Sequence, residues 1–114
     1  MTSPNGTTEL HELVLPVMTN HHGTLFAGQG LQLMAKAAFL AARNLAQREI
    51  VMAGVSGIDF MAPVPVDSRL RARIELMEAT PIEGGMQMAW KCTVEREGSD
   101  KPVCVAESLS RSYL

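Results

Sequence analysis

One long, alanine-rich stretch, residues 26–47, limits what this chain can fold into. It is built of Ala, Leu, Met and Gln, which are strong helix formers. A helix of this length extends about 30 Å at ~1.5 Å per residue. The rest of the chain reads as strands, so this predicted helix is the only one available to cover a sheet.

The predicted helix has an apolar and a polar side. Its apolar stripe follows spacings of three and four residues and comprises Ala27, Leu31, Met34, Ala38, Ala42 and Leu45. Its polar stripe comprises Gln29, Gln32, Lys36, Arg43 and Gln47. The many alanines favour a close approach of the helix to the sheet. Between Thr24 and Arg48 there is no Asp or Glu, so the helix supplies no carboxylate.

Strands are predicted on both sides of the helix, because apolar and polar residues alternate there. The clearest alternation is in residues 69–77, where Leu70, Ala72 and Ile74 would face inward. The predicted strands are residues 10–15, 51–61, 69–77, 86–95 and 103–114, with a turn at 80–85 and a hairpin loop at 97–102. Residues 1–8 are expected to be flexible. The order predicts an α+β domain, an antiparallel sheet wrapped around one helix, whose edge strands pair across a two-fold axis.

The composition narrows the class of protein. A chain of 114 residues forms a single domain, residues 1–114. Its net charge of −2 and aromatic content of 4% disfavour binding to nucleic acid, which needs a basic face with aromatic side chains. No apolar run approaches the ~20 residues of a membrane span, and the start of the chain does not resemble a signal peptide.

The two cysteines, Cys92 and Cys104, fall on neighbouring predicted strands. The hairpin between these strands would place Cys92 opposite residues near Glu107, so we expect no disulfide and a cytoplasmic protein. The chain has no CxxC spacing, and its only close histidine pair is His21-His22. We therefore expect no metal site.

Two motifs stand on either side of the predicted helix. The first reads Pro16, Thr19, Asn20, Gly23, Phe26, Ala27 and Gly28, and the second is the run from Val55 to Val64 that contains Phe60 and Pro63. Their residues and spacing resemble the bacterial broad-specificity acyl-CoA thioesterases of the hot-dog fold. The resemblance implies a hot-dog domain, at least dimeric, that binds acyl-CoA in a tunnel between subunits. Coenzyme A would be part of the substrate, with no separate cofactor.

The resemblance also implies roles for residues. Backbone N–H groups of Ala27 and Gly28 at the helix start would hold the oxyanion of the thioester, and Asn20 would orient water or the thioester. The family carries its catalytic Asp on the helix, where this chain has Ala35, and a related branch has an acid where this chain has Met18. Asp59 is a candidate replacement base, ahead of Glu49 and Asp67. Candidate substrate-binding residues are His22, Gly23, Phe26, Gln32, Phe60 and Pro63.

Each candidate also has a purely structural explanation. Gly28 could be small for packing, Asn20 could cap a turn, and His22 could be an ordinary loop residue. Gln32 and the row Arg69, Arg71 and Arg73 could face solvent instead of coenzyme A. Three functions follow: hydrolysis of acyl-CoA first, an acyl-CoA or acyl-carrier binding protein without a base second, and a hydratase or dehydratase last, since that chemistry needs a helix acid.

Overall fold

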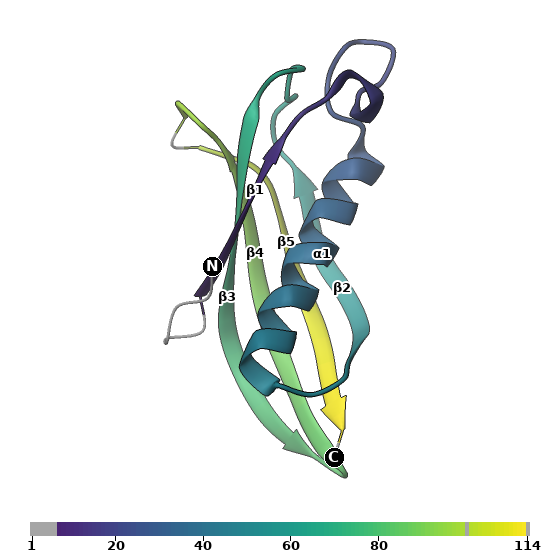
Figure 1. Cartoon of the computed structure of the whole chain (residues 1–114), viewed down its shortest axis with the longest axis vertical. Coiled ribbons are helices and arrows are strands. Elements are labelled where there is room, and N and C mark those ends of the chain that lie inside the picture. Colours follow the sequence, from purple (N-terminus) through teal and green to yellow (C-terminus); the bar gives the residue numbers. More distant parts are fainter. Residues whose placement is uncertain (1–6, 100, 114) are drawn as a thin grey trace.

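The computed structural model describes residues 7–99 and 101–113, and within them one curved antiparallel sheet packs against one helix (Figure 1). In chain order the elements are β1 (Thr7–Leu13), the 3-10 turn η1 (Pro16–Met18), α1 (Ala27–Ala46), β2 (Ile50–Phe60), β3 (Arg69–Ile82), β4 (Gly85–Arg96) and β5 (Pro102–Tyr113). The strand order is β1-β3-β4-β5-β2. The predicted α+β architecture is confirmed.

The core lies between α1 and the inner face of the sheet. Leu70, Ala72 and Ile74 of β3 are almost completely buried, as their alternation predicts. In β4 the fully buried Trp90 donates its indole N–H to the Ser110 hydroxyl of β5, 2.9 Å away. The helix contacts all five strands, so it is the central element of the described domain.

The predicted apolar stripe of the helix is wrong at its two ends. Met34, Ala38 and Ala42 are buried as expected, whereas Ala27 and Leu45 are exposed. The buried face instead comprises Gly30, Leu33, Met34, Ala37, Ala38, Ala41 and Ala42. Small residues dominate this face because the curved sheet approaches the helix axis closely along its length. Large side chains such as Leu45 are left beside the contact.

The predicted turn at residues 80–85 is also wrong, because β3 continues to Ile82 and only Glu83 and Gly84 connect it to β4. Gly84 has φ +77°, which glycine adopts without strain. Proline cannot donate to a sheet hydrogen bond, so Pro81 is tolerated only where the strand has a free side. In the described part of the chain β1 pairs with β3 only as far as Glu75, so Pro81 lies where β3 has a partner on one side.

The two edges of the sheet differ. Strand β1 begins at Thr7, so Thr7 and Thr8 of the segment expected to be flexible are in a strand, and residues 1–6 of that segment lie outside the described residues. At the other edge, only Ile50 of β2 is buried. This strand exposes the apolar side chains of Val51, Met52, Val55, Ile58 and Phe60. Within residues 7–99 and 101–113, no helix combines the length and apolar character needed to cross a membrane.

Candidate functional site

The loop before α1 has a fixed shape. Thr19 and Leu25 form an isolated antiparallel bridge, and the Leu25 N–H donates to the Val64 carbonyl at 2.7 Å. Gly23 turns the loop with φ +74°, a left-handed conformation that glycine adopts readily. The loop is therefore held against the segment that follows β2, and both converge on the start of the helix.

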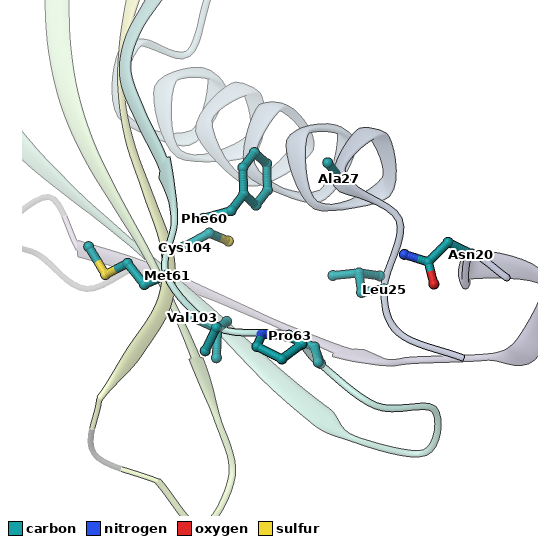
Figure 2. Close-up of a pocket in the computed structure, with 10 residues that line it drawn as sticks. Asn20, Leu25, Ala27, Phe60, Met61, Pro63, Val103 and Cys104 are labelled. Carbon is teal, nitrogen blue, oxygen red and sulfur yellow. The ribbon is translucent and has the colours of Figure 1, made fainter. Parts of the chain in front are cut away.

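Asn20 sits at the centre of this loop and serves it structurally. Its Oδ1 accepts hydrogen bonds from the His22 N–H at 2.9 Å, the Thr24 N–H at 3.3 Å and the Thr24 hydroxyl at 3.2 Å. Two of these are backbone donors, so the amide oxygen is fixed on the loop side. The amide nitrogen then faces the neighbouring pocket, as Figure 2 shows. Asn20 is thus both a turn cap and a hydrogen-bond donor in the pocket.

The start of α1 has free backbone donors. Phe26 is the N-cap residue and offers no side-chain cap, and its carbonyl accepts from the N–H groups of Gln29 and Gly30. The N–H groups of Ala27 and Gly28 meet no acceptor among the described residues. The first turn also contains no acidic side chain. Such a helix start attracts an oxyanion through its free N–H groups and its partial positive charge.

A pocket of about 290 Å³ opens at this helix start (Figure 2). Asn20 and Ala27 line one side, Phe60 and Pro63 another, and Cys104 of β5 belongs to the same lining. No Asp, Glu, His, Lys or Arg is among its lining residues. The pocket therefore offers hydrogen-bond donors and apolar surface, which suits a carbonyl group attached to an apolar chain.

Cys104 is the one titratable residue in that lining, and it is a poor nucleophile. Burial raises the pKa of its thiol from the ordinary 9.0 to about 11. The pKa of Cys92 is raised further, to about 12, by burial and by the nearby Cys104. Both cysteines are free, as predicted, although Cys92 lies opposite Ala106 in the sheet, one position before Glu107. Nucleophilic attack by a thiolate is therefore disfavoured at neutral pH.

This predicts slow alkylation of the folded protein. At pH 8 a thiol with the raised pKa of Cys104 contains about 100-fold less thiolate than an unperturbed one, so iodoacetamide should label it correspondingly slowly. Mass spectrometry after timed labelling, with and without denaturant, measures the difference. Labelling of the native chain as fast as that of the unfolded chain would contradict the prediction.

The other predicted site residues lie around the pocket or away from it. Gly28 follows Ala27 in the helix but is not in the pocket lining, and a Cβ there would lie 2.8 Å from the Phe26 ring, so packing favours glycine. His22, Gly23, Phe26 and Gln32 are exposed and outside the pocket lining. Asp59 lies opposite Val105, between Ile58 and Phe60, which places it on the outer face of the sheet. The structure therefore brings Asn20, Ala27, Phe60 and Pro63 together and leaves Asp59 apart.

Ala35 lines a second cavity, two turns further along α1. This cavity has a volume of about 320 Å³ and an almost wholly apolar wall. Met34 of the helix, Ile58 of β2 and Ala106 of β5 belong to the same wall. The position at which the resemblance places a carboxylate is thus exposed and borders an apolar wall. Among the described residues, no cluster of three His, Cys, Asp or Glu side chains is suited to a metal ion.

Sequence reasoning did not identify several pocket residues, namely Leu25, Met61, Ala62, Val64, Val103 and Cys104. Four of them lie within the spans of the two motifs but were not named as site residues. Val103 and Cys104 come from the last strand, and they reach the pocket because Cys104 pairs with Phe60 across the sheet. Their place in the pocket could have been inferred from a correct strand order, but no local sequence signal indicates it.

Comparisons with known proteins agree on the family. The model of the thioesterase superfamily matches residues 22–103. A 59-residue stretch is 48% identical to 3-hydroxyacyl-thioester dehydratase Z of Mycobacterium tuberculosis, and the match covers 51% of this chain but only 39% of that protein. Among solved structures, the TT0310 protein from Thermus thermophilus superposes with a TM-score of 0.82 at 21% identity over 100% of this chain and 88% of that one. The Staphylococcus aureus acyl-CoA hydrolase, solved with butyryl coenzyme A, superposes with a TM-score of 0.77 at 23% identity over 100% of this chain and 66% of that one. These likenesses confirm the predicted hot-dog fold.

Proposed function

Because this chain belongs to the thioesterase superfamily, we propose that it binds acyl-CoA thioesters and hydrolyses them to a free acid and coenzyme A. One observation carries the proposal: the N–H groups of Ala27 and Gly28 have no acceptor among the described residues, and Ala27 lines a pocket into which Asn20 also presents a donor. The coenzyme A thioester bound by the Staphylococcus aureus structural neighbour supports this substrate class.

In the proposed reaction, a hydroxide ion from the solvent attacks the thioester carbon and the carbonyl oxygen becomes an oxyanion. The N–H groups of Ala27 and Gly28 and the amide of Asn20 stabilise this oxyanion more than they stabilise the neutral carbonyl. Collapse of the tetrahedral intermediate breaks the carbon–sulfur bond and releases coenzyme A as a thiolate, which water protonates. Phe60 and Pro63 would contact the apolar part of the substrate.

The proposal is tested by mixing the purified protein with acyl-CoAs of several chain lengths and following the release of free thiol. Turnover that falls in Asn20→Ala would support it. Because Asn20 also caps the loop, Asn20→Asp is the matched variant: it keeps an acceptor oxygen for His22 and Thr24 and replaces the NH2 donor by a charged oxygen, so turnover should fall although the loop stays capped. Failure of every acyl-CoA to bind would overturn the proposal.

The pocket predicts an unusual pH dependence, because its lining contains no carboxylate or imidazole to act as a base. With hydroxide as the nucleophile, kcat/KM should rise about tenfold per pH unit between pH 6 and 9, whereas a side-chain base would give a plateau above its pKa. Thiol release is measured across this range, and the rate without protein is subtracted at each pH to give the slope. A plateau that Asp59→Asn abolishes would instead make Asp59 the base.

We also propose that two copies of the chain pair along β2. This strand is eleven residues long, it pairs only with β5 among the described strands, and its apolar side chains are exposed. Asp59 and Phe60 lie at its end, so pairing would bring a second subunit next to the pocket. Light scattering should give twice the chain mass of 12.4 kDa, and a mass of one chain at micromolar concentration would contradict the pairing.

Two other functions each have an observation in their favour. The absence of an acid from the pocket lining favours an acyl-CoA or acyl-carrier binding protein, which would bind without releasing thiol. The partial match to a 3-hydroxyacyl-thioester dehydratase favours a hydratase or dehydratase. Such an enzyme would add water to a 2-enoyl-CoA or remove it in the reverse reaction. Spectroscopic loss of the enoyl group, measured beside thiol release, separates all three.

The free thiols of Cys92 and Cys104 support the predicted cytoplasmic location.

A further inference from the structure

The second cavity lies further along the seam between helix and sheet than the first, and the Phe60 ring stands against Gly30 of α1 at the junction of the two. Leu31 lies one turn beyond Ala27, and Ala106 lies two residues beyond Cys104 on the same face of β5. Ile58 likewise precedes Phe60 by two residues on β2. The acyl chain of a thioester held at the helix start would reach this cavity once the Phe60 ring turns aside from Gly30. The cavity, at about 320 Å³, exceeds the ~150 Å³ apolar cavity that accommodates benzene.

One polar residue, Ser108 of β5, interrupts the apolar wall of this cavity. Ser108 is only 6% exposed, and its Oγ is buried with no hydrogen-bond partner in the described part of the chain. Its neighbour on the same strand face, Ser110, differs because its hydroxyl accepts from Trp90. The only other such orphan among the described residues is Arg71 Nε, in a guanidinium that still bonds Glu95 through another nitrogen.

A buried hydroxyl without a partner is unfavourable, and native proteins seldom retain one without a reason. A ligand oxygen in the cavity would satisfy it once rotation of the Ser108 side chain turns the buried hydroxyl toward the cavity. We propose that this cavity binds the acyl group of the substrate and that Ser108 selects acyl chains carrying a hydroxyl or oxo oxygen. This inference rests on the proposed function, because it takes the thioester to lie at the helix start.

The oxygen would lie far from the thioester. Ser108 is four residues along β5 from Cys104, which corresponds to ~13 Å of strand. An oxygen on the third carbon of the chain is too close to the thioester to span this separation. We therefore expect an oxygen near the end of a medium-length chain, which a 10-hydroxydecanoyl group provides.

The test compares decanoyl-CoA, 3-hydroxydecanoyl-CoA and 10-hydroxydecanoyl-CoA on the wild type and on Ser108→Ala. Affinity is measured by calorimetry and kcat/KM by thiol release. The ratio of affinities for the 10-hydroxy chain and the plain chain should fall about tenfold in Ser108→Ala, the effect of one neutral hydrogen bond. A ratio unchanged by Ser108→Ala, or a preference confined to the 3-hydroxy chain, would overturn the inference.

Thermal unfolding of the ligand-free protein provides the matched control. Ser108→Ala removes no hydrogen bond and should leave the Tm unchanged or raise it, whereas Ser110→Ala strips the Trp90 indole of its acceptor and should lower it. Equal losses in the two variants would show that Ser108 has a structural partner, against the inference. If none of the three acyl-CoAs binds, the proposed function fails as well. If all bind alike, only the role of Ser108 fails.

Discussion

Replacing Ala27 by proline is expected to lower kcat/KM for acyl-CoA hydrolysis by about 10²–10³, the usual effect of removing one oxyanion donor. Proline removes the N–H at this position and leaves the helix intact. Ala27 is the first residue of α1, where proline is well tolerated. Phe26 before it has φ −69° and ψ 136°, the extended conformation that a residue before proline adopts.

The control is Ala27→Gly, which keeps the N–H and removes only a methyl group. It should retain most of the wild-type activity, and both variants should show the wild-type circular dichroism spectrum. Wild-type kcat/KM in Ala27→Pro would show that this N–H does not contact the oxyanion. Equal losses in the two variants would assign the effect to the shape of the pocket.

Replacing Gly85 by alanine is expected to destabilise the fold by about 3 kcal/mol or more, with a fall in Tm of roughly 10 °C. A Cβ at Gly85 would overlap the backbone carbonyl oxygen of Ser112. This oxygen belongs to β5, which pairs with β4 along its length, so the clash is between two backbones held in a ladder. Neither can move without breaking sheet hydrogen bonds. Thermal unfolding followed by circular dichroism measures the loss.

The neighbouring Gly84→Asn variant is the matched control. Gly84 has open space around its Cβ position and φ +77°, a conformation that asparagine tolerates better than most residues. Its cost should stay within about 1 kcal/mol. If the Gly85→Ala protein were as stable as the Gly84→Asn protein, the contact between Gly85 and the Ser112 carbonyl would be looser than the structure shows.

Much of the fold could be predicted because it follows from local periodicity. The alternation around Leu70 and Ile74 identified β3, and the composition of residues 26–47 identified α1 to within one residue at each end. The turn after β3 could not be placed, since Pro81 is a turn signal in isolation and an acceptable strand residue only where one side of the strand has no partner.

The candidate site was predictable in part. Asn20 and Ala27 lie together as expected, because the motif that contains them is a contiguous loop and helix start. Cys104 and Ser108 were not predictable, since strand pairing alone brings them beside residues from elsewhere in the chain. Asp59 was a reasonable candidate by position in its motif, but the alternation of β2 turns it to the outer face.

The sequence alone determined the order of elements, the single helix and the donor-bearing loop at its start, because these depend on residue preferences and on spacings within short segments. The tertiary structure decided which face of the helix is buried and which strand remains an exposed apolar edge. It also decided that a serine whose hydroxyl has no partner among the described residues lines the second cavity. These depend on strand order and sheet curvature, which arise from contacts between residues far apart in the chain. Periodicity within a segment carries no information about such contacts.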